Sequence, residues 1–311
     1  MELRLYIGDA FRLLKKKQDA WKGKFRTVFA DPPYFLSNEK RGPGIVRYGR
    51  FAPSTETVDE LNVKKGYRIY KGDWDKNITF KECHDWNYRW LKLVKPLIAE
   101  DGTIWICGLW NFNLAVIRLA IEELGYSHLN NITIIKPNAV PNFRGVRFQS
   151  STEDMIWARA GDKKYFAYRR MKAYNGGKQM KNYWEIPVNT RENIGRHSTQ
   201  KTVEQVKRCI LASTDKNDWV LDPFAGTCTT LKVAKMLQRN AIGVEKGFYY
   251  KNWRSDFFSC RCDKRFKEES QVIKHYEKSG HTPQYLLDIN EKVGWGEQTL
   301  EGKIQYRRFV V

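Results

Sequence analysis

The chain has 311 residues, with 55 lysines and arginines against 35 aspartates and glutamates, so its formal net charge is +20. Such a charge favours a polyanionic partner, most often nucleic acid, although a basic protein of another kind stays open. The sequence shows no strongly apolar span or signal-like N-terminus, which argues against a membrane partner. Its six cysteines lie mostly in apolar runs, as reduced core thiols do. We therefore expect a cytoplasmic or nucleoid-associated protein if the source is prokaryotic, with a nuclear location left open.

The first predicted elements are a strand from Leu3 to Ile7 and a basic helix from Ala10 to about Lys17. Asp9 lies between them. Its carboxylate suits a helix N-cap, and it also suits a hydrogen bond to a ligand at the end of the strand. The sequence leaves both roles open.

The stretch that organises the chain is Val28–Tyr34, which reads VFADPPY. Its apolar residues predict a short buried strand, and the two prolines end it because neither can donate to a strand ladder. Asp31 and a proline carbonyl then offer two acceptors that can hold both hydrogens of an –NH2 group, and Tyr34 offers a flat face for a base. A stiff strand-ending turn without chemistry is the alternative.

The tetrapeptide Asp-Pro-Pro-Tyr resembles the catalytic signature of the DNA amino-methyltransferases. These enzymes transfer a methyl group from S-adenosylmethionine (SAM) to the exocyclic amine of adenine or, less often, cytosine. The resemblance implies that Asp31, Pro32, Pro33 and Tyr34 are the catalytic residues. It also implies that Asp9 approaches the adenine of SAM.

Residues 37–70 are rich in glycine, arginine, lysine and serine, and predict a mobile loop that covers the catalytic turn or contacts DNA. Beyond this loop, helical and strand patterns alternate. The expected elements are a helix from His84 to Leu97, closed by Pro96 and Asp101-Gly102, a strand from Thr103 to Cys107, a helix from Asn113 to Leu124, and strands from Asn131 to Ile135 and from Met155 to Ala158. This alternation predicts an α/β fold with a mostly parallel sheet.

Residues 136–196 mix arginines and lysines with aromatic residues such as Phe148, Tyr165 and Trp184. Such a stretch suits a surface that follows phosphates and reads bases. We therefore expect the target-recognition region here. A solvated basic surface stays the alternative for any single residue.

A second informative stretch, Trp219–Thr230, combines the end of a strand, a glycine turn at Gly226 and the start of a helix. A further strand ends in Glu245, about 20 residues after Gly226. A glycine turn at a helix N-terminus, followed by an acid at this spacing, predicts a nucleotide-like ligand whose ribose hydroxyls the acid binds.

The same stretch resembles the SAM loop of the DNA amino-methyltransferases, Asp-Pro-Phe-x-Gly-x-Gly-Thr-Thr. The resemblance implies a set of cofactor-binding residues in the loop and the following strand: Asp222, Phe224, Gly226, Thr229, Thr230 and Glu245. The chain departs from the family at Cys228, where a glycine is expected, and a Cβ there would crowd the methionine part of SAM. A nucleophilic Cys228 is disfavoured, because the cytosine-C5 enzymes use a Pro-Cys pair and the chain has none.

The segment His-Ser-Thr-Gln-Lys at residues 197–201 resembles the family's His-Pro-Thr-Gln-Lys-Pro segment, which packs over the SAM methionine. The resemblance implies that His197, Thr199, Gln200 and Lys201 belong to the cofactor site. The family's two prolines are replaced, so this turn is less stiff. A helix over residues 203–213 is expected to follow.

The catalytic turn precedes the SAM loop, which is the circularly permuted order of the β group of this family. The chain is thus similar to the adenine-N6-specific DNA methyltransferases of restriction–modification systems. The resemblance implies a Rossmann-like SAM-dependent methyltransferase fold over residues 1–251. It also implies a reaction at the N6 amine of an adenine flipped out of double-stranded DNA at a specific sequence. A homodimer is left open.

Three other functions stay open. Cytosine-N4 methylation uses the same chemistry, although usually with serine in place of Asp31. An amine of RNA or of a protein side chain could be the acceptor. A catalytically weakened DNA-binding protein would result if Cys228 disabled the SAM loop. An NTP-driven enzyme is disfavoured, since the sequence has no G-x-x-x-x-G-K-[ST] loop.

Residues 252–311 extend beyond the family core and predict a small C-terminal module ending in a basic strand. Cys260 and Cys262 are followed after twelve residues by His275 and after five more by His281. This spacing resembles a C2H2 zinc finger, except that the cysteine pair is one residue closer. A structural zinc ion at these four residues is the hypothesis, and chance placement is the alternative.

Overall fold

The computed structural model describes residues 2–35, 78–110, 112–139, 141–142, 145, 148–187 and 200–246, together with the backbone of 258–259, 265–266 and 304–308. Several predictions lie outside the described residues. They are the whole loop over residues 37–70, the cofactor-site residues His197 and Thr199, and the four proposed zinc ligands Cys260, Cys262, His275 and His281.

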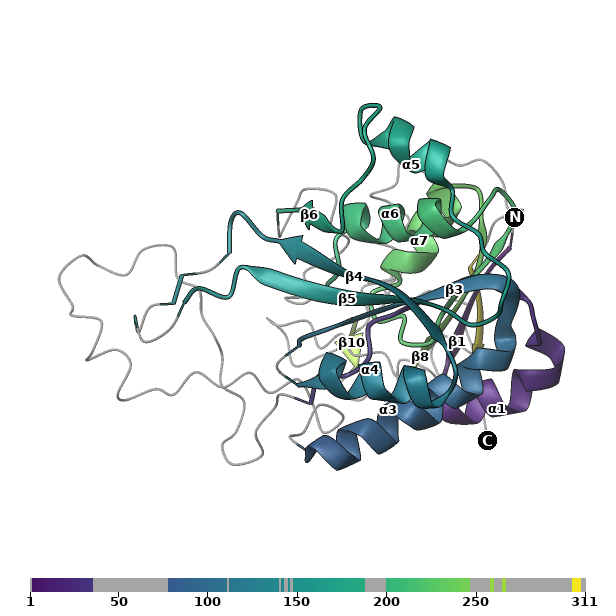
Figure 1. Ribbon diagram of the computed structural model, residues 1–311. Helices are drawn as coiled ribbons and strands as arrows, with labels where there is room; N and C mark the ends of the chain where they lie inside the picture. Colours follow the sequence, from purple (N-terminus) through teal and green to yellow (C-terminus); the bar gives the residue numbers. More distant parts are fainter. Residues whose placement is uncertain are drawn as a thin grey trace.

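The fold is built on a sheet of nine strands in the order β11-β1-β8-β7-β2-β3-β5-β4-β6 (Figure 1). All neighbours are parallel except that β5 runs antiparallel to both β3 and β4. The strands are β1 (Leu3–Ile7), β2 (Phe25–Ala30), β3 (Ile98–Gly108), β4 (Ser127–Ile135), β5 (Thr152–Arg159), β6 (Tyr183–Glu185), β7 (Trp219–Asp222), β8 (Asn240–Glu245) and β11 (Ile304–Arg308). The predicted mostly parallel α/β fold is confirmed.

Helices cover both faces of the sheet, so the molecule has three layers (Figure 1). One face carries α1 (Ala10–Trp21), α3 (Phe80–Val94) and α4 (Asn113–Glu123), and the other carries α5 (Tyr168–Tyr174), α6 (Val203–Ser213) and α7 (Thr229–Met236). A short 3-10 turn, η2 (Lys95–Leu97), joins α3 to β3. No helix in the described part of the chain has the length and apolar character needed to cross a bilayer.

The central strands are buried because helices pack against both of their faces. In β2, every residue except Arg26 is buried, which explains why the sequence shows a nearly continuous apolar run and no alternation. The two helical layers form separate cores, one around Trp105 and Ile210 and the other around Trp90 and Leu13. The sheet is therefore held rigidly between two apolar layers.

Several predicted boundaries differ from the structure: α1 extends to Trp21, β3 spans Ile98–Gly108, β4 begins at Ser127 and β5 spans Thr152–Arg159. Helix α3 begins at Phe80, four residues before the predicted start, because Thr79 and Glu82 form a capping box. Asp101-Gly102, predicted to close this helix, lies inside β3. The dipeptide lies where the register of β3 with β2 shifts, between the pair of Phe25 with Ile98 and that of Thr27 with Thr103, and a Cβ at Gly102 would lie 2.9 Å from the Phe25 carbonyl oxygen.

The C-terminal segment adds two features to the fold. Strand β11 pairs with β1 at the edge of the main sheet, so the predicted basic strand at the end of the chain is confirmed. Strands β9 (Phe258–Ser259) and β10 (Arg265–Phe266) form a separate antiparallel hairpin. Division of the chain at residue 251 stays a prediction.

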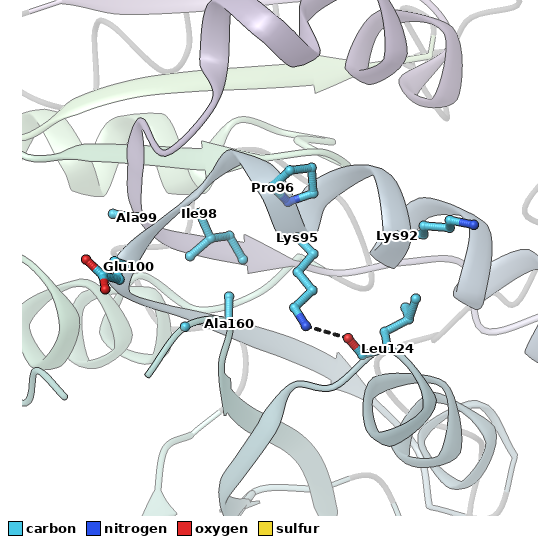
Figure 2. A pocket seen from close by; sticks show the side chains of 9 residues that line it. Lys92, Lys95, Pro96, Ile98, Ala99, Glu100, Leu124 and Ala160 are labelled. Carbon is cyan, nitrogen blue, oxygen red and sulfur yellow. Dashed lines mark hydrogen bonds between the residues drawn. The ribbon is translucent and has the colours of Figure 1, made fainter. Parts of the chain in front are cut away.

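A hollow of about 340 Å³ lies where η2 leads into β3. Lys92, Lys95 and Ile98 line one side of it, and Leu124 lies across from them (Figure 2). The Lys95 ammonium donates hydrogen bonds to the carbonyl oxygens of Leu124, at 2.5 Å, and Gly125, at 2.9 Å. Because β3 starts at Ile98, this hollow lies at the amino ends of the parallel strands, away from the edge where open α/β sheets bind ligands.

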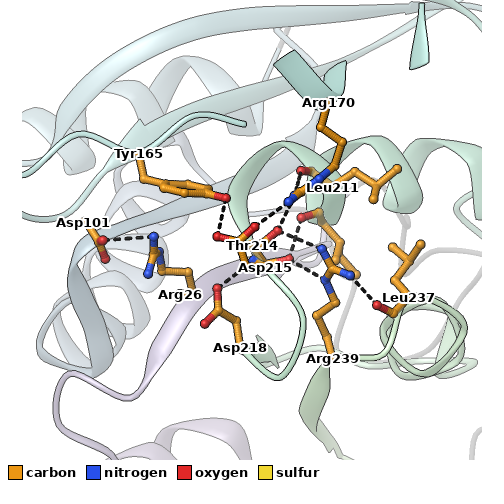
Figure 3. A network of polar contacts seen from close by, with 11 residues as sticks. Arg26, Asp101, Tyr165, Arg170, Leu211, Thr214, Asp215, Asp218, Leu237 and Arg239 are labelled. Atoms are coloured by element: carbon orange, nitrogen blue, oxygen red, sulfur yellow. Dashed lines mark hydrogen bonds and ion pairs between the residues drawn. The ribbon is translucent and has the colours of Figure 1, made fainter. Parts of the chain in front are cut away.

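A polar network fixes the connection between α6 and β7 (Figure 3). Arg239 is only 4% exposed, and its guanidinium donates to the hydroxyl and carbonyl of Thr214 at 3.0 and 2.8 Å. Arg170 donates to the same carbonyl at 2.6 Å and pairs with Asp215, which also accepts from Tyr165 at 2.7 Å. The network ties α5 and the start of β8 to the turn that places β7 in the sheet.

Replacing Arg239 by methionine is expected to lower the free energy of unfolding by about 2–3 kcal/mol, because the buried Thr214 hydroxyl loses its donor and the Thr214 carbonyl keeps only Arg170. Urea titration followed by circular dichroism measures this. Arg169→Met is the matched control, since Arg169 is exposed, and should change stability by less than about 0.5 kcal/mol. Equal effects of the two substitutions would contradict a structural role for the network.

Candidate active site

The predicted catalytic turn and the predicted SAM loop leave the sheet side by side. Strands β2 and β7 are neighbours in parallel register, with Thr27 opposite Val220 and Val28 opposite Leu221. Asp31 follows the last residue of β2, and Asp222 is the last residue of β7. Both segments therefore emerge at the carboxyl edge, where ligands bind in open α/β sheets.

The catalytic turn is held by a buried lysine. The Tyr34 hydroxyl donates to Asp31 Oδ1 at 3.0 Å, and the Lys201 ammonium donates to the same hydroxyl at 2.8 Å. Lys201 Nζ also lies 3.4 Å from Asp31 Oδ1, and only 8% of the Lys201 side chain is exposed. Both contacts of Asp31 thus fall on Oδ1, which leaves Oδ2 without a partner among the described residues.

Glu153 and Lys136 join this cluster, although neither was predicted as a site residue. Glu153 Oε2 lies 3.2 Å from Lys201 Nζ, and Glu153 Oε1 lies 3.2 Å from Lys136 Nζ. The Lys201 ammonium lowers the pKa of Glu153 to about 2, against the effect of its burial. The antiparallel register of β5 with β4, in which Ile135 lies opposite Thr152, brings these residues to the catalytic turn.

The segment before α6 reaches both halves of the site. Gln200 donates to the Thr229 hydroxyl at the start of α7, at 2.9 Å, while the adjacent Lys201 points to Asp31 and Tyr34. The resemblance placed both residues near the SAM methionine. In the structure, Lys201 contacts the catalytic turn, so this segment bridges the turn and the glycine loop.

The glycine loop is closed by two carboxylates. The Gly226 amide donates to Glu245 Oε2 at 2.8 Å, and Gly226 has a φ of 46°, in the left-handed region that suits glycine. Asp222 accepts from the Phe224 amide at 3.0 Å and from the Thr230 hydroxyl at 2.6 Å. Burial raises the pKa of Asp222 to about 7, with smaller contributions from Asp31 and Glu245.

Cys228, which stands where the resemblance leads one to expect glycine, has a backbone conformation that favours glycine. Its φ is 61° and it caps α7 in the left-handed region, which costs a side-chain-bearing residue about 1 kcal/mol. The thiol is fully buried, and burial raises its pKa well above the ordinary value. A neutral, buried thiol is a poor nucleophile, which agrees with the expectation that Cys228 does not act as one.

Asp9 lies at the same edge as a helix cap. Its Oδ1 accepts from the Arg12 amide at 3.1 Å at the start of α1. The neighbouring Gly8 amide donates to the Glu245 carbonyl at 2.7 Å, because β1 and β8 are paired. Asp9 therefore fills the capping role and still stands beside the strand that carries Glu245.

Aromatic rings connect the catalytic turn with the glycine loop. Trp86 of α3 packs against Phe35, next to the catalytic turn, at 5.3 Å between ring centroids, and against Phe224 of the glycine loop at 5.6 Å. Phe224 also meets Trp90 edge-on at 5.3 Å. Phe35 has a φ of 55°, a strained conformation that this packing holds in place. The turn and the loop thus rest on the same helix.

The structure brings most predicted site residues to one edge of the sheet. This set comprises Asp9, Asp31, Pro32, Pro33, Tyr34, Gln200, Lys201, Asp222, Phe224, Gly226, Thr229, Thr230 and Glu245. The catalytic turn offers hydrogen-bond acceptors and an aromatic ring, and the SAM loop with the end of β8 offers a glycine turn and an acid. The arrangement can hold an amine opposite a nucleotide-like ligand.

Comparison with known proteins agrees with this arrangement. Residues 25–256 match the family model described as DNA methylase. The Type II methyltransferase M2.LlaDCHI of Lactococcus lactis subsp. cremoris is 40% identical over 246 residues, which cover 78% of this chain and 83% of that protein. M2.DpnII of Streptococcus pneumoniae is also 40% identical over 246 residues, covering 78% and 84%.

Solved structures share the fold. The cytosine-N4-specific PvuII DNA methyltransferase matches with a TM-score of 0.60 and 17% identity, over 89% of this chain and 92% of that one. The M1.HpyAVI–SAM complex matches with a TM-score of 0.56 and 24% identity, over 80% and 95%.

The raised pKa of Asp222 predicts a pH-dependent stability of the ligand-free chain. Asp222 has a pKa of about 7 in the folded chain against an ordinary 3.8. The contribution of Asp222 to the free energy of unfolding is therefore fully present below about pH 4 and is lost as the pH rises to 7. Between pH 5 and 8 the wild type should lose roughly 2–3 kcal/mol relative to Asp222→Asn. Urea titrations at both pH values measure this. Asp162→Asn, at an exposed site, should follow the wild type, and an unchanged gap between Asp222→Asn and the wild type would contradict the prediction.

Proposed function

The chain belongs to the DNA methylase family, and from this premise we propose that it transfers a methyl group from SAM to the N6 amine of an adenine in double-stranded DNA. The resemblance to the DNA amino-methyltransferases is confirmed at the level of the family. A specific target sequence and a place in a restriction–modification system are part of the proposal. Its relatives M2.LlaDCHI and M2.DpnII are named Type II methyltransferases.

One observation carries the proposal: the acidic turn after β2 and the glycine loop after β7 leave neighbouring strands at the same edge. Asp31 Oδ2 and the carbonyl of Pro32 can each accept one hydrogen of the target amine. These bonds orient the nitrogen lone pair and stabilise the positive charge that it gains. Tyr34 offers an aromatic ring beside the turn for the adenine, and Lys201 fixes its hydroxyl and lies 5.2 Å from the ring centroid.

The glycine loop fits SAM as the methyl donor. Glu245 lies at the end of β8, where its carboxylate can accept ribose hydroxyls, and it holds the Gly226 amide in the ligand-free chain. Phe224 offers an aromatic ring at the loop, and Gln200 and Thr229 supply polar groups at the start of α7. SAM supplies an activated methyl group on a sulfonium. We propose these residues, with Asp9, Asp222, Thr230 and Lys201, as the cofactor site.

Adenine is favoured over cytosine because the turn carries Asp31. In the amino-methyltransferases a serine usually stands there when cytosine is the target. Cytosine-N4 methylation stays the second candidate, since its chemistry is the same. The PvuII enzyme, which is cytosine-N4-specific by its name, shares the fold of this chain.

Double-stranded DNA is the proposed partner, and the target base must leave the stack because its amine cannot otherwise reach the methyl donor. The net charge of +20 favours the phosphate backbone. Phe148, on the arm between β4 and β5, is 99% exposed, and this arm begins at Lys136, which pairs with Glu153. We propose residues 136–196 as the target-recognition region, although Trp157 and Trp184 within it are buried in the core.

A structural zinc ion in the C-terminal segment stays a hypothesis. Among the described residues no cluster of side chains suits a metal ion, and the four proposed ligands lie outside them. Along the sequence, Cys260 and Cys262 fall between β9 and β10. Metal analysis of the purified chain tests it. A cytoplasmic or nucleoid location and a homodimer are further parts of the proposal.

Replacing Asp31 by alanine is expected to reduce methyl transfer to duplex DNA by at least 100-fold, because the amine loses its charged acceptor. SAM affinity should change less than about twofold, since Gly226 and Glu245 are untouched. Incorporation of tritiated methyl groups and calorimetric titration measure the two effects. Asp162→Ala, at an exposed site, is the control. Equal loss of transfer and SAM binding would indicate that the turn is structural only.

A catalytically weakened DNA-binding protein is the alternative of a different class, in which Cys228 prevents SAM binding. We expect the wild type to bind SAM in calorimetric titration, because Cys228 accommodates the left-handed conformation within the core. Cys228→Gly should bind SAM at least as tightly, since a Cβ and a strained φ are removed. Absence of binding at millimolar SAM in the wild type, restored in Cys228→Gly, would support the alternative.

A further inference from the structure

We infer that Glu153 is a positioning residue for methyl transfer, which offsets the charge of Lys201 so that the ammonium does not cancel the negative potential of Asp31 at the target amine. The inference rests on the proposed function. Glu153 itself is not expected to touch SAM or the adenine. It acts through Lys201, which contacts both polar residues of the catalytic turn.

Lys201 is a buried cation shared between partners from three parts of the chain. Its ammonium lies 2.8 Å from the Tyr34 hydroxyl, 3.4 Å from Asp31 Oδ1 and 3.2 Å from Glu153 Oε2. Nearby Cys107 of β3 is buried and its raised pKa keeps it neutral. Asp31 and Glu153 are therefore the two anions that face this ammonium among the described residues.

The reaction makes this balance matter. When the target nitrogen accepts a methyl group, it gains positive charge next to Asp31. An unbalanced ammonium 3.4 Å from the same carboxylate would oppose that charge in a buried site, where electrostatic effects are strong. Glu153 offsets the ammonium. Lys201 can then hold Tyr34 and orient Asp31 without cancelling the negative potential of Asp31 at the target amine.

Glu153 is itself fixed in place. Lys136 Nζ lies 3.2 Å from its other oxygen, Oε1, at the base of the arm between β4 and β5. Glu153 thus lies between two ammonium groups and has a pKa of about 2, so it stays charged at neutral pH. The chain of contacts runs from the proposed target-recognition arm through Lys136, Glu153 and Lys201 to Asp31.

The test compares Glu153→Gln, Glu153→Asp, Lys201→Met and the double variant Glu153→Gln/Lys201→Met, with Glu185→Gln at an exposed position as the matched control. Glu153→Gln should lower kcat for methylation of duplex DNA roughly 10- to 100-fold, less than the loss for a group that contacts the reacting atoms. Its SAM dissociation constant should stay within about twofold of the wild type. Glu153→Asp, which keeps the charge, should recover most of kcat.

The double variant gives the distinguishing result. Since the unbalanced ammonium is gone, its kcat should exceed that of Glu153→Gln several-fold, whereas a purely structural role predicts that the two losses multiply. Multiplied losses would overturn the inference, as would a parallel loss of SAM affinity in Glu153→Gln. If Glu153→Gln does not fold, Glu153→Asp with a kcat as low as that of Lys201→Met would overturn it as well. A folded wild type that methylates no DNA would overturn the proposed function and this inference together, whereas an active wild type leaves only the inference at issue.

Discussion

The pairing of β2 with β7 is the constraint on which the site depends. These strands lie far apart along the chain, at Phe25–Ala30 and Trp219–Asp222, yet they are in register at Thr27 and Val220. Because neighbouring strands are about 4.8 Å apart, the turn that follows one and the loop that follows the other must leave the sheet together. Apolar helical layers on both faces prevent these strands from shifting. The apolar core therefore fixes the position of the catalytic turn relative to the SAM loop.

Both halves of the site hold residues in costly states. Phe35 and Cys228 have positive φ angles without being glycine, and Asp222 and Lys201 are ionisable groups buried in the interior. Three of these costs are offset locally: Trp86 packs against Phe35, Phe224 and Thr230 donate hydrogen bonds to Asp222, and carboxylates pair with Lys201. Strain and buried charge collected at one sheet edge are typical of a functional site.

The sequence predicted those parts of the molecule whose signals are local. Helix α6 begins and ends where its pattern indicates, and the Asp31 turn and the Gly226 turn are each recognisable from a few adjacent residues. Glu153 was missed because a single acid at the start of a strand has no local signature. Its role follows from the antiparallel register of β5, which only the folded sheet defines. The motif alone placed Lys201 near the cofactor, whereas packing in the folded chain directs its side chain to Asp31 and Tyr34.

The central claim is that this edge of the sheet methylates the exocyclic amine of adenine in DNA. The most direct measurement is mass spectrometry of nucleosides released from duplex DNA after incubation with the full chain and SAM carrying a deuterated methyl group. We expect deuterated N6-methyldeoxyadenosine to form, in an amount that saturates when a limited set of sites is filled. Deuterium found in N4-methyldeoxycytidine, or in no nucleoside although SAM is bound, would contradict the claim.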